Sequence, residues 1–340
     1  MITLAILLTL ILVFVFILGT VIGSFLNVVI LRAFSGESIV LPPSKCPNCG
    51  NKLKWWHNIP ILSYIILKGK CGFCHEKISI QYPIIEFITG CLFVAVFCKY
   101  GLYPHTLFGF AVASILLVLT VTDIKKQIVF DSHTYFLIAL GLIYNLLLTG
   151  FDVYDKIDSI SGFHLTAQWA FSTPITESLL GLILGAIIME IAARLGYLIA
   201  GSRAFGEGDT YIAAGLGAVF GWQNIILIII AAVILQITFT LPIFIKKQFE
   251  LRNWQAPISL LCFLLYAGIF FIAQHKNLIP TKMIYLICAI IPLLAFGTIA
   301  CYYTLKGIKN EENRTYLPFG PALAISGIIL LLANNITFTI

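Results

Sequence analysis

Two aspartates stand at the edges of apolar segments in a chain of 340 residues that has only 15 acidic residues. Asp123 ends the stretch SILLVLTVTD, and Asp209 lies in AFGEGDTYIAAGLG, just ahead of another apolar run. A charge inside a membrane-spanning segment costs roughly 2.5–3.5 kcal/mol on insertion scales, which makes each residue a functional candidate. Two carboxylates held together can share a proton and act as general acid and general base. For either residue alone, the alternative is an aspartate at a helix end that the membrane interface keeps hydrated.

Four cysteines form a second group with chemical potential. Cys46-Pro-Asn-Cys49 and Cys71-Gly-Phe-Cys74 are two CxxC pairs separated by 21 residues, a spacing close to that of four-thiolate zinc sites. A segment this small buries too little apolar surface to fold alone, so a structural metal would supply the missing stability. The alternatives are disulfides, which a reducing cytoplasm disfavours, and four idle thiols. His75 directly follows Cys74 and could compete as a ligand.

Composition identifies the solvent around these groups. Hydrophobic residues make up 60% of the chain and charged residues 11%, and the mean hydropathy is +1.00. A soluble globular domain has roughly 25% charged residues, so the composition excludes that class and predicts an all-α polytopic membrane protein. The net charge of +6 is interpreted as charge that orients the chain in the membrane, and no nucleic acid partner is expected.

Apolar segments of about 20 residues match the thickness of the hydrocarbon core. We expect about eight core transmembrane helices plus an extra pair, for which the sequence suggests no function. The sixth segment is short and rich in glycine, so the region 209–245 is interpreted as either one span or two. The predicted segments are 4–30, 83–99, 105–123, 132–149, 174–200, 209–221, 224–245, 256–274, 283–305 and 319–338, and the extra pair is 256–274 with 283–305.

The positions of lysine and arginine predict the orientation. Most of the 21 basic residues fall in the loop 31–82 and in later loops on the same side of the membrane. By the positive-inside rule that side is cytoplasmic, so the N-terminus lies outside and the chain passes the membrane many times. Asp123 and Asp209 then both lie at the cytoplasmic edge, which suggests that they form a shared site.

These observations divide the chain into five predicted regions. They are a first transmembrane helix at 1–30, a small cytoplasmic four-cysteine domain of the zinc-binding type at 31–82, a catalytic membrane domain with both aspartates at 83–245, the extra transmembrane pair at 246–317 and the last transmembrane helix at 318–340.

Six ordered sequence blocks then carry a resemblance to a known family. They are Gly23 to Ile30 with Arg32, the cysteine segment with Trp55, Asn58 to Tyr64 and Gly69 to Cys74, the stretch Tyr82 to Glu86, the stretch Asp123 to Asp131, the tetrad Gly206 to Asp209, and Pro318 to Pro321 at the start of the last helix. In this order the blocks resemble the bacterial type IV prepilin peptidases, which are membrane aspartic proteases of the GxGD class.

The resemblance implies an activity and a place in the cell. It implies an enzyme of the bacterial inner membrane that removes the basic leader from prepilins or pseudopilins at the cytoplasmic face. Many members of this family also methylate the new N-terminus with S-adenosylmethionine. Matched by motif position, Asp123 and Asp209 would be the catalytic pair, and zinc would be structural. Two departures, Val129-Phe130-Asp131 instead of Leu-Pro-Asp and Tyr211 in place of lysine, leave both carboxylates but put substrate preference and methylation in question.

Five further residues near these motifs have two interpretations each. Gly206 and Gly208 either allow a close helix approach beside Asp209 or belong to an ordinary flexible loop. Asp131 either caps the next helix or supports the site. Glu207 either attracts a basic leader or is solvated. Glu86 either suits the N-terminus of its helix or meets a substrate amine.

Two other function classes compete with a protease. One is a non-proteolytic membrane transporter whose intramembrane carboxylates relay protons or cations, although no repeated halves are evident. The other is a methyltransferase or scaffold that kept the fold without proteolysis. No glycine-rich nucleotide-binding turn follows a strand, so S-adenosylmethionine is expected only through the family resemblance.

Overall fold

The fold was analysed in a computed structural model that describes residues 2–38, 40, 43–46, 48–159, 173–200, 206–250, 318–333 and scattered positions between 254 and 292. Two compact units divide the chain, and the larger one contains both aspartates and all four CxxC cysteines. The smaller unit comprises Arg194–Ala204 and Ile234–Leu317. Most residues of the predicted extra pair, 256–274 and 283–305, lie outside the described residues.

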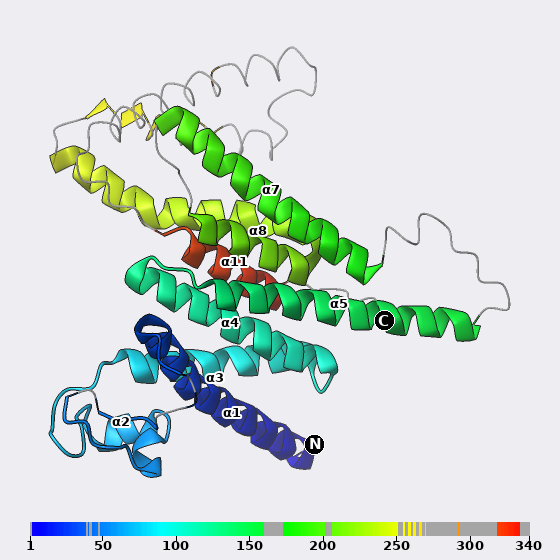
Figure 1. Cartoon of the computed structure of the whole chain (residues 1–340). Coiled ribbons are helices and arrows are strands. Elements are labelled where there is room, and N and C mark those ends of the chain that lie inside the picture. The colour runs from blue at the N-terminus through cyan, green and yellow to red at the C-terminus, as the bar shows by residue number, and fades with distance from the viewer. Residues whose placement is uncertain are drawn as a thin grey trace. The chain divides into compact units, whose positions relative to one another are not determined.

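Helices make up the ordered elements of the described residues, which confirms the predicted all-α class. Six of these helices are long and apolar enough to cross a membrane. Helix α5 continues ten residues beyond the predicted segment 132–149, because FDVYDKIDS after Gly150 contains no helix breaker. The elements are α1 (Ile2–Ser35), η1 (Trp55–Asn58), α2 (Leu62–Ile66), α3 (Gln81–Tyr100), α4 (Pro104–Lys126), α5 (Asp131–Ser159), α7 (Pro174–Ala200), α8 (Glu207–Glu250) and α11 (Gly320–Ala333) (Figure 1).

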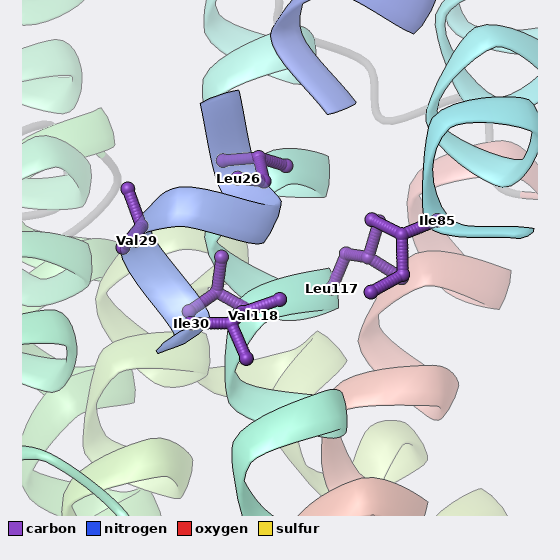
Figure 2. Close-up of a cluster of buried hydrophobic side chains, with 6 residues drawn as sticks. All are labelled: Leu26, Val29, Ile30, Ile85, Leu117 and Val118. Carbon is purple, nitrogen blue, oxygen red and sulfur yellow. The ribbon is translucent and has the colours of Figure 1, made fainter. Parts of the chain in front are cut away.

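Helices α1, α3 and α4 share a buried apolar cluster. Small residues let α1 and α3 approach closely, since a Cβ on Gly19 would lie 2.8 Å from the Cα of Gly90 and one on Gly23 would lie 2.8 Å from the Cα of Glu86. Such close backbone contact is the usual way in which membrane helices associate. The cluster fixes the C-terminal half of α4, which bears Asp123. Its members are Leu26, Val29, Ile30, Ile85, Leu117 and Val118 (Figure 2).

Helix α8 turns back on itself at Gly221. This residue has φ 80° and ψ 172°, a conformation open to glycine but costly for other residues. A Cβ on Gly185 of α7 would lie 2.5 Å from the carbonyl oxygen of Ala213 and 3.2 Å from Cγ1 of Ile225. In a continuous helix these two residues would be about 18 Å apart, so the chain must reverse between them. The reversal agrees with the interpretation of this region as two segments.

Side chains from two neighbouring helices replace a helical hydrogen bond at this turn. The carbonyl of Ala218 would pair with the N–H of Trp222 in an unbroken helix, but Gly221 moves that N–H away. Asn145 of α5 donates to the Ala218 oxygen from Nδ2 at 3.1 Å, and Ser178 of α7 donates from Oγ at 2.5 Å. Both donors are buried, and they supply hydrogen bonds to a carbonyl that lipid could not hydrogen-bond.

Candidate active site

Asp123 is buried near the C-terminal end of α4, with 3% of its surface exposed. The helix ends one turn later at Gln127, whose φ of 54° is left-handed and whose N–H donates to the Asp123 carbonyl at 2.8 Å. Lys125 and Lys126 fill the last turn, where cations suit the negative end of the helix dipole. The sequence therefore places a carboxylate one turn inside a span and ends the helix just after it.

Asp209 lies in the first turn of α8, with 8% of its surface exposed. Its Oδ2 accepts a hydrogen bond from the N–H of Gly206 at 3.1 Å, which ties the carboxylate to the loop ahead of the helix. A Cβ on Gly208 would lie only 2.5 Å from Cβ of Val129, in the loop that follows α4. Gly208 therefore permits a close approach, which brings the Asp209 turn against the chain just past Asp123.

Gly320, the first residue of α11, lies against both carboxylates. A Cβ there would lie 2.4 Å from Oδ2 of Asp123 and 3.1 Å from Cδ1 of Ile212, one turn beyond Asp209. The backbone N–H of Gly320 interacts with the carboxylates of Asp123 and Asp209, and Asp123 also experiences the negative charge of Asp209. The two predicted aspartates are thus brought together by three helices, with the N-terminus of α11 between them.

This arrangement suits shared-proton chemistry. The N-terminus of a helix carries about half a positive charge, which stabilises negative charge on nearby carboxylates. Oδ2 of Asp123 is buried and has no hydrogen-bond partner among the described residues, so this oxygen can carry the shared proton. Two adjacent carboxylates with one proton between them can activate a water molecule and protonate a leaving group.

The other predicted residues lie in different surroundings. Asp131 is exposed at the first residue of α5, and Glu207 is exposed at the first residue of α8, so both acidic side chains lie at helix N-termini. Glu86 is buried at 6% exposure and accepts the N–H of Ile61 at 2.7 Å. Glu86 therefore connects the cysteine-containing segment to α3. Among the described residues, no hydrogen bond is found between Glu86 and either aspartate.

Gly320 belongs to the site, although the sequence alone does not assign it there. From the sequence, the block Pro318-Phe319-Gly320-Pro321 predicts only the start of the last helix. Its signal was a glycine next to a proline at a helix start, which also fits ordinary helix initiation. Only the packing of α11 against α4 and α8 shows that a side chain at this position would meet Asp123.

The four cysteines form a compact cluster from two similar turns. Each CxxC motif is closed by an isolated antiparallel bridge, Lys45 with Lys52 and Lys70 with Lys77. The same backbone bonds recur: the N–H four residues after the first cysteine donates to that cysteine's carbonyl, at 2.9 Å from Gly50 and 3.0 Å from His75. Gly50 and His75 both have positive φ. The repeated geometry points the thiols of both motifs at one centre.

The donor set fits a tetrahedral zinc ion. The four sulfur atoms, from Cys46, Cys49, Cys71 and Cys74, all lie within 4.8 Å of one another, and those of Cys46 and Cys74 are 3.9 Å apart. Zinc–sulfur bonds of about 2.3 Å place sulfurs roughly 3.8 Å apart in a tetrahedron. Hydrogen bonds from the backbone N–H groups of Cys74 and Phe73 lower the pKa of Cys71 to about 7. The pKa of Cys74 is raised to about 11 despite a hydrogen bond from the N–H of Glu76, because of desolvation and the neighbouring thiols. A bound cation would therefore be needed to hold all four as thiolates. His75 is not part of the cluster.

Comparison with known proteins agrees with this geometry. Residues 17–100 match the bacterial peptidase A24 N-terminal domain, and residues 110–241 match the type IV leader peptidase family. A prepilin leader peptidase/N-methyltransferase of Neisseria gonorrhoeae is 35% identical over 229 residues, which cover 60% of this chain and 72% of the relative. The chain belongs to the type IV leader peptidase family. Both aspartates of this leader peptidase lie within the second matched region, and the four cysteines lie within the first.

Two further relatives of this leader peptidase carry the same name. The prepilin leader peptidase/N-methyltransferase of Klebsiella pneumoniae is 33% identical over 62% of this chain and 85% of its own length. That of Myxococcus xanthus (strain DK1622) is 29% identical over 94% of this chain and 89% of its own length. No solved structure matches the chain.

Proposed function

We propose that this protein is a membrane aspartic endopeptidase that removes the basic leader from type IV prepilins or pseudopilins, with Asp123 and Asp209 as its catalytic pair. The observation that carries the proposal is the meeting of two buried carboxylates at the N-terminus of α11, next to Gly320. Membership in the leader peptidase family and the names of the relatives support the same activity. A transporter has no comparable support.

Hydrolysis by this pair needs no covalent intermediate. Two carboxylates close together cannot both ionise easily, so one holds a proton while the other is charged. The charged carboxylate takes a proton from the attacking water, and the protonated one donates to the carbonyl oxygen of the scissile peptide. The carboxyl that took the water's proton then donates it to the leaving amine as the C–N bond breaks, and the other carboxylate takes back a hydroxyl proton as the new C=O bond forms, which returns the pair to its starting protonation state. The N–H of Gly320 helps to orient the carboxylates throughout.

The test is cleavage of a prepilin by membranes that contain Asp123→Asn or Asp209→Asn protein. Loss of a general acid or base costs about 10²–10⁴-fold in rate, so both variants should cleave at no more than about a hundredth of the wild-type rate. Asp131→Asn is the matched control, because this aspartate is exposed at the start of α5. Wild-type cleavage by both active-site variants would reject the proposal.

The remaining regions are proposed to support this reaction. We propose that the segment 31–82 is a structural zinc domain on the cytoplasmic face, since four protein thiolates leave no open coordination position for water. Its cysteines would hold the ion, and the bound metal would supply folding stability. The division into 1–30, 31–82, 83–245, 246–317 and 318–340 is retained as a proposal. The lysine-rich loop 31–82 supports an inner-membrane orientation with the N-terminus outside.

Methylation of the new N-terminus is proposed as a second activity. It is supported by the name prepilin leader peptidase/N-methyltransferase, which the relatives share. S-adenosylmethionine would supply the methyl group when bound. Isothermal titration of the purified protein with S-adenosylmethionine tests this activity independently of cleavage, because Asp123→Asn protein should bind the compound as the wild type does. Absence of binding to both proteins at saturating concentration would reject the second activity and leave the first intact.

A further inference from the structure

The cysteine-containing segment has an exposed apolar face on its short helix. In α2, Leu62, Ile65 and Ile66 are 57%, 63% and 75% exposed. Trp55, in the neighbouring η1 helix that contacts α2, is 74% exposed. Three large aliphatic side chains on five helical residues are more than a water-facing surface normally shows. Some partner should therefore cover this face.

A hydrogen bond places the apolar face beside the membrane. Ile61, the residue before α2, donates its N–H to Glu86 in the second turn of α3, which is a candidate membrane span. Asn27 of α1 donates to the carbonyl of Tyr82 at 3.2 Å, which holds α1 against the first turn of α3. Since α2 is about 7.5 Å long, all its side chains lie within a short distance of the point where α3 enters the bilayer.

The charges around this face have one sign. Between residues 43 and 80, Glu76 is the single acidic residue of the sequence. Lys54 extends over the ring of Trp56, with 5.0 Å between Nζ and the ring centroid, and Lys68 lies two residues after the end of α2. Six lysines in this stretch are exposed: Lys45, Lys52, Lys54, Lys68, Lys70 and Lys77.

We propose that the exposed face of α2 rests on the anionic lipid surface of the same membrane, with Leu62, Ile65 and Ile66 inserted at the level of the headgroups. Short amphipathic helices bind this interface through apolar side chains, and lysines around them pair with anionic headgroups. Tryptophan is likewise enriched there. The lysines disfavour a second copy of this chain as the partner, because two identical basic surfaces repel one another.

The contact gives the segment a fixed height above the membrane. The bond from Ile61 to Glu86 holds one side of the segment, and the lipid contact of α2 holds the other. The zinc cluster is then supported at both sides rather than on a free loop.

Site-specific photocrosslinking in the full-length protein identifies what covers α2. A benzoylphenylalanine at Ile66 should form lipid adducts, detected as a mass shift of the corresponding peptide, in nanodiscs of phosphatidylglycerol. The same probe at Glu76, which is exposed on the second cysteine turn, is the matched control and should give few adducts. Covalent dimers from Ile66, adducts that form only when prepilin is added, or equal lipid labelling from both positions would each overturn the proposal.

A charge variant tests the choice of lipid. In Lys54→Gln/Lys68→Gln protein, the preference of the Ile66 probe for phosphatidylglycerol over phosphatidylcholine should fall severalfold. Zinc content is measured on the same samples and should stay at the wild-type level. That result would show that the segment is still folded. An unchanged lipid preference in folded protein would overturn the electrostatic part of the proposal. Neither measurement needs cleavage, so both are independent of the proposed function.

Discussion

Replacing Gly320 by alanine is the sharpest test of how the two carboxylates are held. The added Cβ would lie 2.4 Å from Oδ2 of Asp123, whereas ordinary van der Waals contacts begin at 3.4 Å. Either the carboxylate or the start of α11 must therefore move by about 1 Å, and a misplacement of that size costs about 10²-fold in rate. Overpacking at a buried position also costs about 1–3 kcal/mol of folding stability.

The assay is cleavage of a prepilin by purified protein in nanodiscs, with kcat and KM measured separately. We expect kcat to fall about 100-fold. KM should change little, because the substitution displaces the carboxylate that we propose to be catalytic rather than a surface that holds the substrate. A thermal melt of the same sample shows that the protein remains folded.

Gly327→Ala is the matched control on the same helix. Its Cβ would lie 2.6 Å from Cδ2 of Leu216, a terminal methyl that can rotate away, so this variant shares the overpacking but leaves both carboxylates undisturbed. It should keep a kcat near the wild-type value. If Gly320→Ala cleaves as fast as Gly327→Ala at equal thermal stability, then α11 does not position the pair and the reasoning fails.

Three other substitutions have defined outcomes. Gly208→Ala places a Cβ 2.5 Å from that of Val129, so cleavage should fall and should partly return in Gly208→Ala/Val129→Ala protein; no recovery would contradict the steric explanation. Glu86→Ala leaves the N–H of Ile61 without its buried acceptor and should lower the free energy of unfolding by about 1–3 kcal/mol, which a lower melting temperature would show. An unchanged melting temperature would contradict a stabilising role for this hydrogen bond. Cys71→Ser should lower the zinc content below one ion per chain and destabilise the segment, whereas full zinc occupancy by elemental analysis would show that this thiol is not a ligand.

The sequence predicts the reactive groups better than it predicts their supports. Asp123 and Asp209 stand out because few carboxylates border apolar runs, and Cys46 to Cys74 stand out by spacing, so both signals are local. Gly320 gives no such signal, since its role depends on where α11 meets two other helices. The role of Glu86 was open for the same reason, because its acceptor function requires the N–H of Ile61, which lies 25 residues away.

The turn at Gly221 shows the same limit of local information. A short glycine-rich segment suggests a break, but the sequence cannot show which groups compensate for it. Asn145 and Ser178 lie 73 and 40 residues before Ala218, and they converge on its carbonyl only after α5, α7 and α8 have packed. Substitution of both donors by alanine would leave that carbonyl unpaired within the membrane, where an unsatisfied group costs several kcal/mol.

The reversal at Gly221 also sets the depth of the aspartates in the membrane. The first arm of α8, residues 207–220, is 14 residues long, which corresponds to about 21 Å, whereas the hydrocarbon core is about 30 Å thick. Trp222, directly after the turn, suits a position at the far headgroup boundary. With the turn anchored there, we expect Asp209 to lie several ångströms beneath the opposite surface. Hydrolysis at this depth requires that the bilayer be locally thinner or that water reach the carboxylates. The rate of cleavage should therefore depend on the thickness of the bilayer.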